Sequence, residues 1–178
     1  MQTKKLLLVV IILIGGFAVL GSYAYGASTY PSAGDILWGG VPQSIRSIYT
    51  VNMFLAAAGY FAFTYFILFR LNPDDSRVAR RFGFGVFILL YAAILIPSAL
   101  WLPLTFQAVE QSSQVFAWAA RLVLVVVGLA SLGLLFALLS LQPRQPFWAY
   151  RMAVIGSLFF CIQTVILDAI IWGASFQL

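Results

Sequence analysis

The chain has 178 residues, of which 63% are hydrophobic and only 8% are charged. A soluble globular domain usually carries about 25% charged residues, so this composition excludes an ordinary soluble domain and predicts an integral membrane protein. The net charge of +5 does not indicate nucleic-acid binding, because the basic residues fall at the ends of separate apolar segments and do not form one patch.

Long apolar segments predict the helices, since about 20 helical residues cross a hydrocarbon layer of about 30 Å. The connections between these segments are short and leave no room for a separate soluble domain. We therefore expect residues 1–178 to form a single domain, an all-α bundle of five transmembrane helices. The expected spans are approximately 6–25, 49–69, 83–104, 115–141 and 152–174.

The first segment also has features of a secretory signal, because Lys4 and Lys5 precede it and small residues follow at 22–24. Its apolar run is at the long limit for a signal peptide. We expect an uncleaved first helix.

The connection 26–48 is the longest expected loop, and it is expected on the outer side of the membrane. It is rich in Gly, Pro and Ser but also contains aromatic residues, which favour a position against the membrane surface. A loop of this length is often functional. Tyr30 and Trp38 are therefore candidates for a lid over an outer pocket. A docking surface for a neighbouring subunit and a plain interfacial anchor are the alternatives.

The distribution of basic residues predicts the orientation. Eight of the ten lysines and arginines lie at one set of segment ends, and only Arg46 and Arg121 lie at the other. The positive-inside rule then places the N-terminus in the cytoplasm and the C-terminus on the opposite side, in a bacterial inner membrane or an equivalent organelle membrane. The basic inner loop 70–82 is expected to be a topology signal with a helix cap, and a platform for anionic lipid or for a partner's acidic loop is the alternative.

One carboxylate, Asp168, lies in the apolar sequence VILDAIIWGAS of the last segment. An unpaired charge at membrane depth costs at least about 2.5 kcal/mol, so Asp168 needs a partner. Arg121 on the preceding segment has a compatible depth, and the sequence predicts a buried ion pair between the two. A protonated Asp168 that serves as a proton or ligand site, and an Asp168 exposed to a water-filled cavity, are the alternatives.

Other polar or polarisable residues share the expected helix face of Asp168, because they follow one another at steps of three and four residues. This stripe is expected to face the bundle, for packing or for binding, and an amide from the second segment lies near it. The residues are Ser157, Cys161, Thr164, Trp172 and Asn52.

Residues for catalysis and metal binding are scarce. The chain has no histidine, a single cysteine and five acidic residues that are scattered along the sequence. Both lysines lie at the extreme N-terminus, away from any serine within the expected spans. The sequence therefore predicts no catalytic site, no metal site and no cofactor, and the protein is expected not to be an enzyme.

Two functions remain. The first is that of a non-enzymatic accessory or assembly subunit, held in the lipid bilayer with protein partners of a larger membrane complex. The alternative is a binding or transport protein for a hydrophobic or amphipathic small molecule, with its pocket at the outer side of the bundle. A bound lipid, pigment or other hydrophobic ligand would then occupy that pocket.

Overall fold

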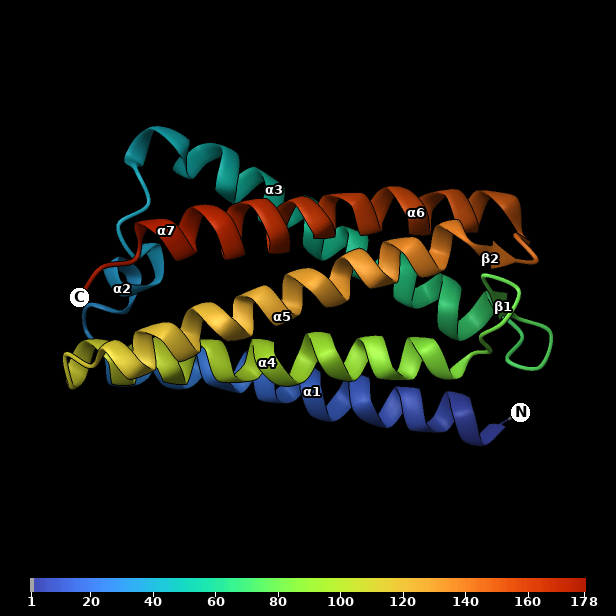
Figure 1. The fold of residues 1–178 in the computed structure, drawn as a ribbon, viewed down its shortest axis with the longest axis horizontal. Coiled ribbons are helices and arrows are strands. Elements are labelled where there is room, and N and C mark those ends of the chain that lie inside the picture. The colour runs from blue at the N-terminus through green and yellow to red at the C-terminus, as the bar shows by residue number, and fades with distance from the viewer. Residues whose placement is uncertain (1) are drawn as a thin grey trace.

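The computed structural model describes residues 2–178 and confirms the all-α class, with five helices long and apolar enough to cross a membrane (Figure 1). The first three of these are α1 (Gln2–Thr29), α3 (Gln43–Tyr65) with its π-helical extension η1 (Phe66–Arg70), and α4 (Gly85–Glu110). The fourth is α5 (Gln114–Leu139). The fifth consists of α6 (Phe147–Cys161), the π-helical segment η2 (Ile162–Trp172) and a last turn, α7 (Gly173–Ser175).

Each long helix extends beyond its expected apolar segment at one end or at both, although α4 begins and α5 ends slightly inside the expected span. α1 continues to Thr29, and α3 begins at Gln43, several residues before the expected start at 49. Hydropathy marks only the apolar part of a helix, whereas the helix itself continues until a residue such as Pro31 interrupts it. The loop expected at 26–48 is therefore shorter, and it contains the additional helix α2 (Ala33–Trp38).

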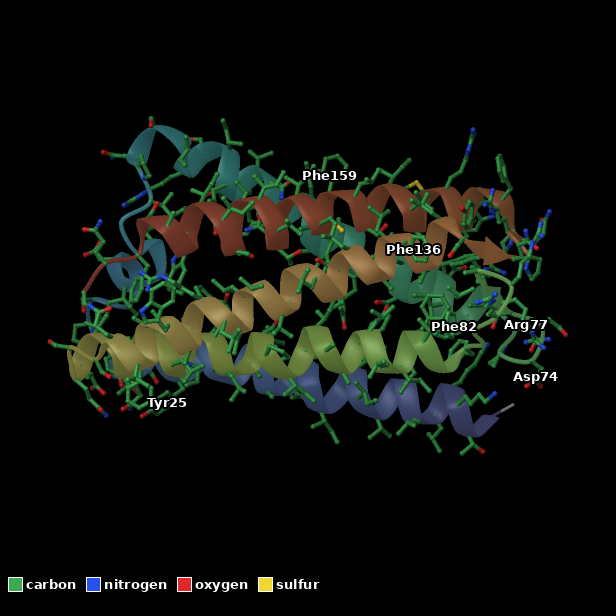
Figure 2. The ribbon with its side chains drawn as sticks, in the orientation of Figure 1. Tyr25, Asp74, Arg77, Phe82, Phe136 and Phe159 are labelled. Atoms are coloured by element: carbon green, nitrogen blue, oxygen red, sulfur yellow. The ribbon has the colours of Figure 1, made fainter. Side chains whose placement is uncertain are left out.

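A small antiparallel sheet, which the sequence did not predict, joins two loops at one end of the bundle. In it β1 (Arg77–Val78) pairs with β2 (Leu141–Gln142). Strands of two residues are too short to give a readable alternation of apolar and polar residues. We call this end, which also holds the N-terminus, the sheet end, and the end with α2 and the C-terminus the α2 end (Figure 1). Figure 2 shows Asp74 and Arg77 at the sheet end and Tyr25 toward the α2 end.

The long helices form an open ring. α1 packs on α4, α4 on α5, α5 on α6 and η2, and α6 on α3. α1 and α3 are successive long helices in the chain but are not packed along each other. Figure 1 shows them farthest apart near the α2 end, where α3 begins at the upper edge and α1 lies at the lower one. The ring therefore has a gap between α1 and α3.

Glycines set the closest approaches between helices. α3 and α6 cross at Gly59 and Gly156, where a Cβ atom on Gly156 would lie 2.6 Å from the Cα atom of Gly59. α1 packs on α4 through Gly15, where a Cβ atom would lie 2.7 Å from the Cβ atom of Leu95. Small residues allow such backbone approach between apolar helices, for which van der Waals contact is the main attraction in lipid. These two contacts hold α1 and α3 against different neighbours.

The main hydrophobic core lies toward the sheet end. It contains fully buried aromatic side chains from α3, η1 and α4, and from the residue just before α4. These include Phe63, Phe66, Phe84, Phe87 and Tyr91. Large rings therefore fill the interior of this half of the bundle.

Candidate functional site

A cavity of about 780 Å³ lies between the middle of the bundle and its α2 end. All five long helices and α2 contribute to its wall, which is mostly apolar and aromatic. The wall residues range from Ile12 of α1 and Phe61 of α3, near the middle, to Trp38 of α2 at the far end. The cavity is thus the space that the open ring encloses.

The cavity opens sideways through the gap between α1 and α3. Wall residues on these two helices have highly exposed side chains: Phe17 of α1 is 73% exposed and Phe61 of α3 is 71% exposed. By contrast, Ile94 of α4, Leu124 and Val127 of α5 line the same cavity and are buried. The rim of the opening is therefore apolar, and α4 and α5 form the deepest part of the cavity wall.

Asp168 lies in the cavity wall and has neutral partners. Its Oδ1 atom accepts a hydrogen bond from the phenol of Tyr49 on α3 and a second one, at 2.9 Å, from the side-chain amide of Gln163. Asn52 of α3 donates in turn to Oε1 of Gln163 at 3.1 Å and to the carbonyl of Phe159 at 3.2 Å. We call Asn52, Tyr49, Gln163 and Asp168 the Asp168 cluster. It ties α3 to η2.

The expected ion pair between Asp168 and Arg121 is not formed within the described residues 2–178. Arg121 donates instead to the carbonyls of Gly173 at 2.8 Å and Phe176 at 2.6 Å. Carbonyls at the C-terminal end of a helix lack partners within the helix and carry partial negative charge, so they satisfy the guanidinium.

The expected pair rested on the similar depth of the two residues, and depth does not show which neighbouring helix a side chain faces. The segment that carries Asp168 also has π-helical hydrogen bonding. The N–H group of Gly173 bonds to the carbonyl of Asp168, five residues earlier, whereas an α-helix uses a spacing of four. The wider turn changes the direction of each side chain relative to an ideal α-helix. Asp168 faces Tyr49 of α3 and not Arg121 of α5.

The stripe expected on the last helix is buried, but its members have separate roles. Thr164 lies in the cavity wall and shares a hydrogen bond of 2.5 Å with Ser131 of α5. Ser157 donates to the carbonyl of Val154 in its own helix, and Cys161 is a buried free thiol. Of these three, only Thr164 has a side-chain hydrogen bond to a neighbouring helix among residues 2–178. The remaining two belong elsewhere: Asn52 to the Asp168 cluster and Trp172 to the contact with α2.

The two lid candidates lie in different places. Trp38, the last residue of α2, is part of the cavity wall, with its ring 5.6 Å from that of Tyr49 between centroids. Tyr30 lies before α2 and stacks on Phe106 of α4 at 4.1 Å between centroids, outside the cavity wall. The structure therefore places Trp38 over the α2 end of the cavity and Tyr30 at an anchor of the loop.

Contacts with the backbone carbonyls of Leu37 and Ser175 hold α2 and the residues after it against the end of the last helix. The indole N–H of Trp172 donates to the carbonyl of Leu37 at 2.8 Å. After α2, Gly40 adopts a φ of +89°, and a Cβ atom there would lie 2.6 Å from the carbonyl oxygen of Ser175. Only glycine combines this conformation with such a close approach. Leu37 and Gly40, which flank Trp38 in the chain, are thus both held against the last helix.

Trp101 of α4 adds a polar group that the sequence did not single out. Its side chain lines the cavity, and its indole Nε1 atom is buried without a hydrogen-bond partner among residues 2–178. A buried N–H group is normally paired, so this one is a free donor beside the cavity. Its place near the end of an expected span predicts only an interfacial tryptophan, and no sequence signal separates the two roles.

The arrangement is suited to binding. The apolar wall can hold an apolar body, and the polar groups near the α2 end can orient one polar or charged group of a ligand. Within residues 2–178 no group of three or more His, Cys, Asp or Glu side chains is placed to hold a metal ion. No family model matches the chain, and neither a curated protein nor a solved structure matches it.

Proposed function

We propose that the protein is a multi-pass membrane protein that binds an apolar or amphipathic small molecule in its cavity and admits it sideways from the lipid. The observation that carries this proposal is the cavity of about 780 Å³, with its apolar wall and its opening between α1 and α3. Small-molecule sites typically measure about 300–1,000 Å³ and combine apolar walls with a few polar groups. Volume, lining and opening all agree with this class.

The distribution of cations supports an orientation with the α2 end away from the cytoplasm. Arg77 lies at the sheet end, as does Arg144 beside it in the loop after α5. With most of the basic residues at that end, the positive-inside rule assigns it to the cytoplasm of a bacterial cell or an equivalent compartment. The cavity then lies in the outer half of the membrane.

A role as an accessory or assembly subunit of a larger membrane complex is the second proposal. The observation that favours it is α1, which packs on α4 and leaves the rest of its apolar surface free. Ile14, for example, is 67% exposed. Such a helix can face lipid or a helix of a partner protein, and the two proposed roles are compatible.

Two glycines of α1 provide a matched test of ligand binding. Gly16 lines the cavity, and a Cβ atom there would meet no neighbouring atom within 4 Å, so Gly16→Trp should place an indole ring in the cavity and obstruct ligand binding. Gly21 has equally open surroundings but is not part of the wall, which makes Gly21→Trp the control.

Native mass spectrometry of gently extracted protein measures the outcome. We expect the wild type and Gly21→Trp to retain a bound small molecule, and Gly16→Trp to be free of it. Equal retention by all three proteins, or a wild type that never carries a small molecule, would contradict the binding role. Fixed comigration with another protein would support the second proposal.

A further inference from the structure

We propose that the cavity selects a lipophilic organic cation whose charge pairs with the carboxylate of Asp168. This inference rests on the proposed binding function and adds the chemical class of the ligand. Three observations support it: the one-sided hydrogen bonding of Asp168, the positions of the two nearby arginines, and the aromatic side chains around the same end of the cavity.

Only one of the two carboxylate oxygens of Asp168 accepts hydrogen bonds within residues 2–178. Both of its hydrogen bonds, from Tyr49 and Gln163, end on Oδ1, and Oδ2 accepts none from residues 2–178. Oδ2 is also absent from the buried polar atoms that lack partners, so it is accessible, and the side chain lines the cavity. Neutral donors orient a carboxylate but do not compensate its charge. The accessible oxygen thus offers a place for a positive group.

No positive side chain among residues 2–178 lines the cavity. The guanidinium of Arg121 is bound to carbonyls at the end of the last helix. Arg46 donates to the carbonyl of Val41, and its guanidinium lies 4.9 Å from the ring centroid of Trp38. Both arginines are thus held by other groups, and a cation in the cavity would be the partner that Asp168 lacks.

Aromatic side chains from four helices surround the same end of the cavity. Tyr23 of α1 lies 6.2 Å from Trp101 of α4, and Trp38 of α2 lies 5.6 Å from Tyr49 of α3, between ring centroids. All four line the cavity. The faces of such rings attract organic cations, most strongly where water is excluded. An anion of the same shape would meet the same rings but would be repelled by Asp168.

Three molecules with the same four-ring body and different charge separate charge from shape. They are tetraphenylphosphonium, which is cationic, tetraphenylsilane, which is neutral, and tetraphenylborate, which is anionic. Equilibrium dialysis of the purified protein in detergent, corrected for uptake by empty micelles, gives a Kd for each. We expect the cation to bind roughly tenfold or more tightly than the neutral molecule, as for an interaction with a charged group, and the anion to bind most weakly.

The variant Asp168→Asn removes the charge but keeps an oxygen that can accept from Tyr49 and Gln163. We expect it to lose the preference for the cation and to keep the affinity for tetraphenylsilane, which also verifies that the cavity is intact. Asp35→Asn is the matched control, because Asp35 of α2 is exposed and outside the cavity wall. It should retain the wild-type preference.

The outcomes distinguish a failure of the proposed binding function from a failure of the proposed preference for cations. If no member of the series binds the wild type, the proposed binding function fails. If the neutral molecule binds and the cation binds no more tightly, Asp168 serves the packing of α3 and η2 alone and the cation proposal is overturned. A cation preference that survives in Asp168→Asn overturns the assignment of Asp168 as the counter-ion.

Discussion

Tyr49 of α3 and Asp168 of η2 lie 119 positions apart in the chain and are joined by a hydrogen bond from the phenol to the carboxylate. Gln163 donates to the same oxygen, so one atom of Asp168 fixes two side chains. The contact joins α3 to the last helix near the α2 end, whereas Gly59 and Gly156 bring the same two helices together nearer the middle.

Tyr49→Phe should lower the thermal stability of the protein in detergent. The change leaves the ring in place and removes the phenol from Asp168, and loss of a buried hydrogen bond to a charged or polar partner costs about 1–3 kcal/mol. Tyr25→Phe is the control, because Tyr25 is exposed and its phenol makes no hydrogen bond within residues 2–178. Equal melting temperatures for the two variants would show that the Tyr49 contact contributes nothing.

Double-mutant cycles can separate the observed partner of Asp168 from the partner that the sequence predicted. Tyr49→Phe combined with Asp168→Asn should give strongly non-additive stability losses, because the two side chains are in contact. Arg121→Gln combined with Asp168→Asn should be additive to within about 0.5 kcal/mol. Thermal or denaturant unfolding in detergent provides the values. A coupling energy between Arg121 and Asp168 as large as that between Tyr49 and Asp168 would indicate that the ion pair forms, and it would contradict the observed geometry.

Gly156→Ala should weaken the crossing of α3 and α6. The added methyl group would lie 2.6 Å from the Cα atom of Gly59, and backbone atoms cannot move aside as a flexible side chain can. Overpacking of this kind typically costs about 1–3 kcal/mol. Gly21→Ala, also within a helix, has open space and should be neutral or slightly stabilising. The comparison of their melting temperatures checks the crossing point, and a stable Gly156→Ala protein would refute it.

Trp172→Phe should loosen α2. The substitution keeps an aromatic ring in the core but removes the N–H group that donates to the carbonyl of Leu37. We expect faster amide hydrogen exchange in residues 33–38, whereas Trp148→Phe, at an exposed position on α6, should leave that exchange unchanged. Unchanged exchange in both variants would mean that other contacts hold α2 in place.

The five long helices could be predicted from hydropathy, because the length of each continuous apolar segment in the sequence gives the approximate length of a helix. The ends of the helices were less predictable. Residues 26–29 extend α1 and residues 43–48 belong to α3, and both stretches lie outside the continuous apolar segments. The pairing of β1 with β2 depends on how two distant loops meet, which no local pattern encodes.

The candidate site was predictable only in part. Asp168 could be found because a lone carboxylate at membrane depth has a high free-energy cost, and the surrounding apolar sequence is enough to reveal it. Its partners could not be found, because depth guided the choice of partner, and depth does not show which neighbouring helix a side chain faces. The cavity itself arises from the gap between α1 and α3, and such a gap is a property of the tertiary arrangement.

The most direct test of the binding cavity is labelling with a neutral apolar probe that carries a photoreactive diazirine, followed by peptide mapping. Ile94, Leu124 and Val127 are buried but line the cavity, so they should be labelled in a saturable manner, and Gly16→Trp should abolish that labelling. Leu129, which is 65% exposed and outside the wall, should be labelled without saturation in both proteins. Labelling confined to exposed residues such as Leu129, with none at the three cavity residues, would contradict the account.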